Sequence, residues 1–378
     1  MTIRSTGWCA GMLLLIGSLT TAEAAGPLTQ VGSWMSVGSP THDLVIKDNL
    51  AYVVTDIGLR VFDLSNLPAD PAPRGSIALR GRGLGIALNG SHVYVANQSR
   101  DLQIVDVSNP DSLVLVSTKT LPGYAWDVAL KDDRATGGPL IAYVASFSGE
   151  LYLIDVTDPS RPQQIQVLGL WPWSNPKLDD KLLAKLNSYV TGGSAKITGV
   201  TVEGHMLMSF DWTWGRAFFY DVSQADNPIF AGTHYAPFTF RGEIDLDSPH
   251  GPTAYILSAY ASFSGLYSFP LSLLTPFDST YHATCAACDF FAAPPTDNGG
   301  MALSASGKYA MYIAGKRPVI QVVDISDPTD LKDAGSVPIP PHRARNAQSM
   351  GVAQHGDYII VAGAYLGLGV FHYPGLSN

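Results

Sequence analysis

Charged residues and cysteines are scarce in this chain of 378 residues. Only 15% of the residues are charged, and 23 Lys and Arg are outnumbered by 32 Asp and Glu, which gives a net charge of −9. Proteins that bind nucleic acids need clustered basic residues to neutralise phosphates, so this composition argues against a nucleic-acid partner. The hydrophobic content of 46% excludes an intrinsically disordered chain.

Local catalytic motifs are also missing. The sequence contains no calcium-binding loop, nucleophile elbow, phosphate-binding loop or His-Glu-x-x-His pattern. We therefore assign no catalytic residue, no metal ligand and no cofactor from the sequence. An enzyme would have to assemble its site from residues that lie far apart along the chain.

The cysteines outside the N-terminal segment are Cys285 and Cys288. Asp289 follows them where attachment of a c-type haem needs a histidine. A zinc site would need His282 and one further ligand, and a thioredoxin-like redox pair needs a strand–helix context that is missing here. In an exported protein we expect a local disulfide between Cys285 and Cys288.

The N-terminal segment predicts export. It combines Arg4, a short apolar run at residues 12–16 and the small-residue end Ala22-Glu23-Ala24. This pattern is typical of a secretory signal peptide, here residues 1–24. The alternative, a membrane anchor, needs roughly 20 apolar residues, and neither this run nor any later one is that long. We expect a periplasmic, extracellular or cell-surface protein without a transmembrane segment after cleavage.

A unit of roughly 40–50 residues repeats along the rest of the chain. Each copy has a Tyr-containing apolar strand, such as 51–54, and then an apolar strand that ends in aspartate. The clearer copies carry this aspartate at Asp63, Asp106, Asp155, Asp221 and Asp324. Two looser copies, at 254–269 and 358–372, bring the number to seven. The aspartates have the residue type of ligands or acids, but a residue present in most copies is expected to accept hydrogen bonds from the turn that follows it.

Four strand signals in each unit predict an all-β fold, a seven-bladed β-propeller of four-stranded antiparallel blades. The last copy stops after its third strand, whereas segment 30–37 precedes the first inner strand. We expect this N-terminal strand to complete the last blade and close the ring. Residues 25–378 then form one propeller domain. Six or eight blades remain alternatives because the fifth copy is weak.

The run of two apolar residues followed by Val-Asp-Val-Ser-x-Pro resembles the motif of the LVIVD repeat family. The resemblance covers nearly all of residues 25–378 and is specific in the first, second, third and sixth copies. It implies an exported or surface-associated β-propeller of bacterial or archaeal type. The family has no assigned chemistry, so the resemblance transfers no catalytic residue.

Aromatic residues gather in the loops that we expect on one face of the propeller. The longest of these loops, about 170–196, contains a predicted helix at 179–190. The tryptophans expected on this face are Trp126, Trp171, Trp173, Trp212 and Trp214. Exposed aromatic clusters on loops mark binding surfaces, here for a glycan, a peptide or an envelope protein. The alternative is that these rings anchor the inserted helix and are buried.

Basic residues also precede several inner strands. Arg82, Lys196, Arg241 and Arg345, with His42 before the first inner strand, are expected at the mouth of the central channel, where they would attract an anionic ligand. The alternative is ordinary solvated charge, with Asp43, Glu243 and Asp297 available to neutralise it. The sequence thus predicts an exported binding or scaffold module with its ligand on an aromatic-rich rim. The alternative is a propeller enzyme, a hydrolase, lyase or metal-dependent oxidase, with residues that converge on the channel.

Overall fold

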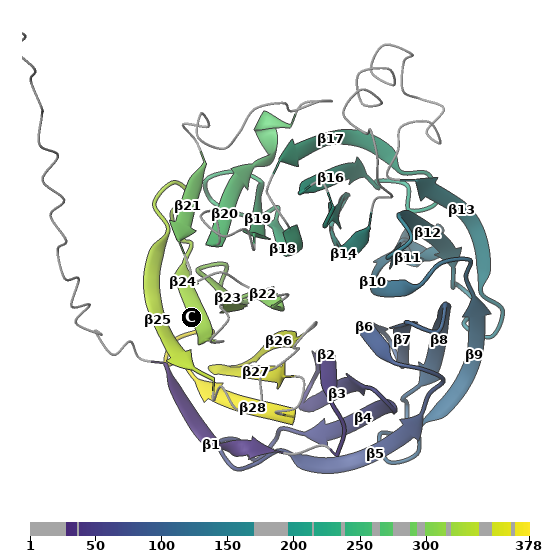
Figure 1. Ribbon diagram of the computed structural model, residues 1–378, viewed down its shortest axis with the longest axis horizontal. Coiled ribbons are helices and arrows are strands. Elements are labelled where there is room, and N and C mark those ends of the chain that lie inside the picture. Colours follow the sequence, from purple (N-terminus) through teal and green to yellow (C-terminus); the bar gives the residue numbers. More distant parts are fainter. Residues whose placement is uncertain are drawn as a thin grey trace, which may run out of the picture.

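The computed structural model describes residues 28–35, 38–169, 196–213, 215–235, 239–258, 265–274, 288–292, 299–314, 319–339, 350–363 and 367–378. These residues form seven four-stranded antiparallel sheets arranged in a ring. The predicted seven-bladed β-propeller is therefore confirmed (Figure 1). The helical elements described are the short 3-10 turns η1 (Arg134–Thr136) and η3 (Leu271–Leu273).

Each blade runs from an inner strand near the ring axis to an outer strand at the circumference (Figure 1). The inner strands are β2 (Thr41–Lys47), β6 (Gly83–Asn89), β10 (Ala125–Asp132), β14 (Ile197–Glu203), β18 (Thr239–Asp245), β22 (Met301–Leu303) and β26 (Met350–His355). The second strands are β3 (Leu50–Thr55), β7 (His92–Asn97), β11 (Leu140–Ser146), β15 (Met206–Asp211), β19 (Thr253–Ser258), β23 (Tyr309–Ala314) and β27 (Tyr358–Gly363).

The two remaining strand positions complete every blade. The third strands are β4 (Gly58–Asp63), β8 (Asp101–Asp106), β12 (Glu150–Asp155), β16 (Arg216–Asp221), β20 (Gly265–Pro270), β24 (Val319–Asp324) and β28 (Gly367–His372). The outer strands are β5 (Ala72–Ala78), β9 (Val114–Thr120), β13 (Gln163–Gly169), β17 (Ile229–Tyr235), β21 (Asp289–Ala292), β25 (Lys332–Pro338) and β1 (Thr29–Met35).

The N-terminal strand closes the ring. β1 pairs antiparallel with β28, with Thr29 opposite His372 and Val31 opposite Val370. The last blade therefore has the order β1-β28-β27-β26 and unites both ends of the described chain (Figure 1). The predicted closure is confirmed, and it removes the unpaired sheet edge that the last blade would otherwise have.

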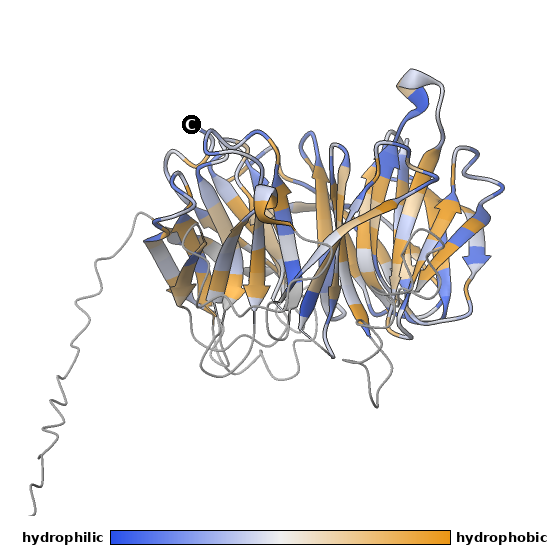
Figure 2. Ribbon diagram, turned by 90° about the horizontal axis from the view of Figure 1, so that it is seen from above, coloured by the Kyte–Doolittle hydropathy of each residue, from blue (hydrophilic) through white to orange (hydrophobic). Residues whose placement is uncertain are grey.

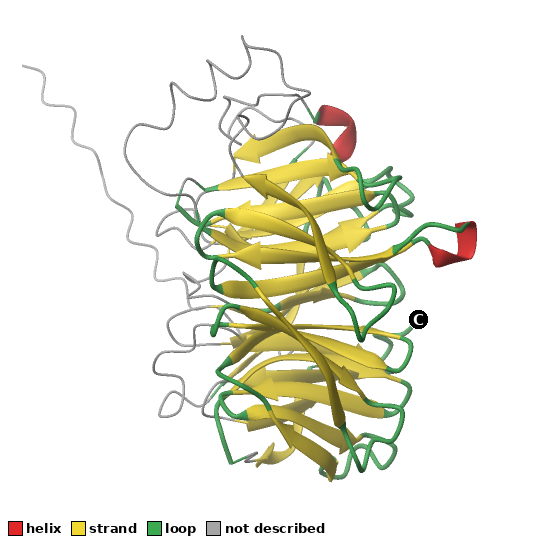
Figure 3. Ribbon diagram, turned by 90° about the vertical axis from the view of Figure 1, so that its right-hand side faces the viewer, coloured by secondary structure: helices red, strands yellow, loops and turns green. Residues whose placement is uncertain are grey.

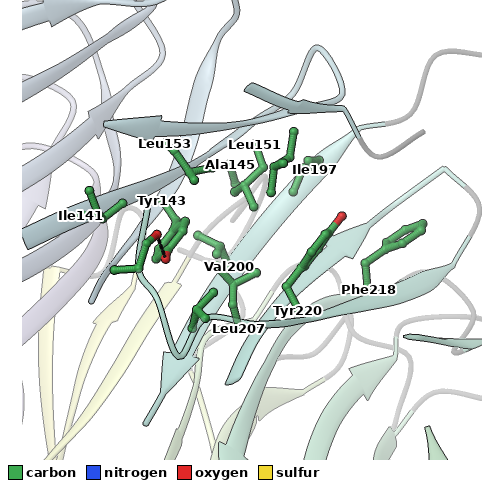
Figure 4. Packing of buried hydrophobic residues seen from close by; sticks show 13 residues of the cluster. Ile141, Tyr143, Ala145, Leu151, Leu153, Ile197, Val200, Leu207, Phe218 and Tyr220 are labelled. Carbon is green, nitrogen blue, oxygen red and sulfur yellow. Dashed lines mark hydrogen bonds between the residues drawn. The ribbon is translucent and has the colours of Figure 1, made fainter. Parts of the chain in front are cut away.

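The core is divided among the contacts between neighbouring blades. The described residues form seven hydrophobic clusters, and each draws its members from two adjacent sheets. In the cluster between the third and fourth blades, Leu207 lies against Tyr143, whose hydroxyl donates a hydrogen bond to the carbonyl of Ala225 (Figure 4). Because the middle strands are covered on both faces, they are nearly continuous in buried residues.

The repeated aspartates stabilise turns. Their side chains accept hydrogen bonds from the backbone N–H two residues further on, with distances of 2.8–2.9 Å in five blades. This confirms the structural role expected from the sequence. In Figure 2 apolar residues are concentrated in the strands, whereas hydrophilic ones are frequent in the turns at the upper face. Figure 3 shows that loops and turns connect the strands at both faces of the ring.

Candidate functional site

One face of the ring holds the starts of the inner strands together with the turns between second and third strands. A backbone hydrogen bond that recurs from blade to blade joins the two. The residue after the second strand donates its N–H to the carbonyl of the residue just before the inner strand. The pairs are Asp56–Pro40 at 3.1 Å, Gln98–Arg82 at 2.9 Å, Phe147–Tyr124 at 2.9 Å and Trp212–Lys196 at 3.0 Å. We call this face the rim. The regular bond fixes equivalent side chains of successive blades at one level of the ring.

Three aromatic rings of the third and fourth blades form a stacked row on the rim. Trp126, at the start of β10, stacks on Phe147 of the β11–β12 turn with ring centroids 4.7 Å apart and planes 22° from parallel. Phe147 in turn stacks on Trp212, with centroids 6.3 Å apart and an angle of 27°. All three side chains are half-buried. We refer to Trp126, Phe147 and Trp212 as the aromatic row.

Lys196 completes this group. Its ammonium lies 4.6 Å from the ring centroid of Phe147 and 5.0 Å from that of Trp212, within the range of cation–π attraction. The backbone N–H of Lys196 donates to the carboxylate of Asp211 at 3.1 Å, which ties the residue to the end of β15. The predicted aromatic sector thus brings Trp126 and Trp212 together in space.

Several predicted residues lie outside the described part of the chain. These are Trp171, Trp173, Trp214, Arg345 and Cys285, together with the predicted helix at 179–190 and the signal peptide. Cys288 is described and packs against the core between the fourth and fifth blades. The Cys285–Cys288 disulfide therefore stays a prediction.

Arg82 lies on the rim in a cluster with His42 and Asp56. The Asp56 carboxylate accepts from Nε2 of His42 at 2.6 Å and from Nε of Arg82 at 2.6 Å. Burial would raise the pKa of Asp56, but these two hydrogen bonds outweigh it and lower the pKa. Burial also lowers the pKa of His42, against the effect of Asp56, so the ring is neutral at neutral pH. Arg82 therefore carries its charge with a counterion beside it.

Arg241 lies deeper, near the ring axis, and joins three blades. Its guanidinium donates to Asp127 of β10 at 2.5 Å and to Asp43 of β2 at 3.2 Å. Asp127 also accepts from the backbone N–H of Val200, in the neighbouring strand β14, at 3.1 Å. The side chain of Asp127 is 2% exposed, and that of Arg241 is 23% exposed. Arg241 is therefore not an ordinary solvated charge. It forms ion pairs that are shielded from solvent near the ring axis.

Glu243 lies next to this ion pair and accepts a hydrogen bond of 3.0 Å from the hydroxyl of Thr201. Burial raises the pKa of Glu243 to about 7, with Asp127 and Asp43 adding repulsion and Arg241 opposing it. Burial likewise raises the pKa of Asp43 to about 6 and raises that of Asp127. We call Asp43, Asp127, Thr201, Arg241 and Glu243 the axial cluster. It contains three carboxylates for one guanidinium.

Glycines in the inner strands leave space for the side chains of the axial cluster. Six of the inner strands have a position that pairs with the penultimate residue of the second strand, and the residues there are Asp43, Gly85, Asp127, Gly199, Arg241 and Gly351. A Cβ on Gly85 would lie 2.5 Å from the Asp127 carboxylate, and one on Gly351 would lie 2.6 Å from that of Asp43. Charged residues in alternate blades therefore depend on glycine between them.

Sequence reasoning missed Phe147 and Asp127. Phe147 directly follows a second strand, as Trp212 does, so alignment of the repeats on that position would have found it. Asp127 occupies the repeat position of Asp43 and Arg241, and the same alignment would have grouped the three.

The axial cluster and the rim provide two kinds of chemistry. The aromatic row offers ring surface and an ammonium, whereas Glu243 is a carboxyl that exchanges a proton near neutral pH. Across the described ranges, no group of three or more His, Cys, Asp or Glu residues is arranged to hold a metal ion. No helix among these residues has the length and apolar character to cross a bilayer.

Comparison with known families gives one match. The model of the LVIVD repeat matches residues 38–77, 80–120, 122–166 and 299–338. These segments correspond to the first, second, third and sixth blades, the copies in which the sequence motif is most specific. No curated protein matches the chain.

Proposed function

We propose that this β-propeller, which carries LVIVD repeats in four of its blades, is an exported binding module. The ligand is a glycan, a peptide or an envelope protein held at the rim. The observation that carries this proposal is the aromatic row, in which three half-buried rings from two blades gather on one face. Rigid aromatic side chains supply contact area at low cost in conformational entropy.

Export rests on the sequence of residues 1–24 alone. The full chain expressed in a bacterium should lose these residues and be recovered outside the cytoplasm. N-terminal sequencing of the recovered protein should begin at Ala25. Recovery of the uncut chain in the cytoplasmic fraction would refute export, and the Cys285–Cys288 disulfide would then lose its basis.

A binding screen with glycans and peptides tests the rim. Trp126→Ala and Trp212→Ala should each weaken binding about tenfold or more, as truncation of a central interface aromatic does. Phe290→Ala is the matched control, because Phe290 is a half-buried ring that contacts Tyr267 in the fifth blade, with centroids 4.4 Å apart. If the two Trp variants unfold instead, or bind every ligand as well as the wild type does, the rim is a packing feature.

A second candidate is a propeller enzyme centred on the axial cluster. The observation in its favour is Glu243, whose pKa of about 7 suits a general acid or base. Against it, the guanidinium of Arg241 is engaged by Asp127 and Asp43. A panel of hydrolase and lyase substrates, assayed with the wild type and with Glu243→Gln, would decide. Turnover that Glu243→Gln abolishes would establish the enzyme, and absence of turnover across the panel leaves the binding module.

A further inference from the structure

The aromatic row uses most of its ring faces internally. Both contacts in the row are stacked, so Phe147 stacks on two tryptophans. Lys196 approaches two of the same rings. An aromatic face carries partial negative charge, whereas the ring edge carries partial positive charge. A row whose faces are turned inward therefore presents electropositive edges.

The charge of Lys196 has the same sign as those edges, and no acid in the described part of the chain neutralises it. Within the described residues no carboxylate forms an ion pair with Lys196, whose ammonium instead lies on Phe147 and Trp212. The rim cation Arg82 and the axial cation Arg241 differ, because their nitrogens lie 2.6 and 2.5 Å from carboxylate oxygens. Lys196 is thus the cation of this group that is available to a ligand anion.

Trp126 ends the described row on the side of the third blade. The ring contact that it makes among the described residues is with Phe147, and its side chain is only half-buried, so part of its surface can contact a ring of the ligand. The apolar face of a pyranose suits such a surface, and an acidic sugar adds a carboxylate for the ammonium beside it. These two features, an aromatic ring and a cation that no described carboxylate neutralises, favour an acidic sugar over a neutral one.

We propose that the aromatic row and Lys196 bind a glycan that contains uronic acids. This inference rests on the proposed function and specifies its ligand. A sugar ring stacks on Trp126, and a carboxylate of the same or the next sugar lies beside Lys196. The ion pair is half-buried among aromatic rings, so it is stronger than a pair on an open surface.

The probe is a short oligogalacturonate, compared with the same oligosaccharide after methyl esterification of its carboxylates. The two share their sugar rings and differ in charge. The full chain should bind the acid form about tenfold or more tightly than the ester, and added salt should weaken the acid form alone. Lys196→Gln should remove this preference, and Lys196→Arg should keep most of it. Lys308→Gln, which changes an exposed lysine at a turn on the opposite face, is the control and should leave both affinities unchanged.

The outcomes separate this inference from the proposed function. Equal affinity for the acid and the ester, with both lost in Trp126→Ala, would overturn the uronic-acid assignment and leave the rim as a binding surface for neutral glycans. Binding of acidic peptides with no affinity for either oligosaccharide would overturn the assignment and point to a protein partner. If neither oligosaccharide binds and no rim variant affects any ligand in the screen, the proposed function fails as well.

Discussion

Glu243→Gln replaces a buried carboxyl by a neutral group of nearly the same shape, and the structure gives the pH range in which this change should stabilise the fold. Burial near Asp127 and Asp43 raises the pKa of Glu243 from its ordinary value of 4.5 to about 7. The folded protein therefore holds a proton that the unfolded chain releases between these two pH values. Stability is then highest below the lower value and falls as the pH rises toward 7.

The size of the effect follows from the same pKa. A change from 4.5 to about 7 corresponds to about 3 kcal/mol between the protonated and ionised forms. At pH 5 the wild-type carboxyl is largely protonated in the folded state, so the variant and the wild type should be similarly stable. At pH 8 the wild type bears an ionised, desolvated carboxylate, and the variant should be more stable by up to about 3 kcal/mol.

Urea denaturation followed by tryptophan fluorescence at both pH values measures the difference. Asp330→Asn is the control, because Asp330 is 60% exposed beside Lys332. It should change the free energy of unfolding by less than about 1 kcal/mol at either pH. A Glu243→Gln variant that gains no stability between pH 5 and pH 8, or that loses stability at pH 8, would refute the reasoning about burial.

Two further variants test the contacts between blades. Arg241→Met leaves the buried carboxylates of Asp43 and Asp127 without their cation, and it should lower the free energy of unfolding by about 3–5 kcal/mol at pH 8, as measured by urea denaturation. Adding Asp43→Asn and Asp127→Asn should recover part of this loss, and the absence of any recovery would contradict the ion-pair account. Leu207→Ala creates a cavity between the third and fourth blades (Figure 4) and should lower the free energy of unfolding by about 2–5 kcal/mol in the same assay. A decrease of less than about 1 kcal/mol would mean that this contact between blades is not tightly packed.

The blades could be predicted from the sequence because their signals are local. The aspartate after each third strand, the turn that follows it and the apolar middle strands all lie within one repeat. Closure by the N-terminal strand could also be predicted, since the last copy lacks an outer strand and segment 30–37 precedes the first inner strand. Each of these inferences needs only the order of strands along the chain.

The candidate site could be predicted in part. The repeat positions of Trp126 and Trp212 predict that they lie on one face, and in the structure each stacks on Phe147. The pairing of Arg241 with Asp127 could not be read in this way. These residues are 114 positions apart, and their contact depends on how three blades turn their inner strands toward a common axis. A single repeat does not contain that information.

The shared last blade has a consequence for how the molecule is made. β1 precedes the other described strands in the chain, whereas its partner β28 follows them, so β1 must wait until the strands between them have been made before it can pair. Six blades have all their strands contiguous in sequence, but the seventh is assembled from both extremities. A chain that stopped short of Gly367 would leave β1 unmatched and the neighbouring hydrophobic surfaces of the first and sixth blades open to solvent.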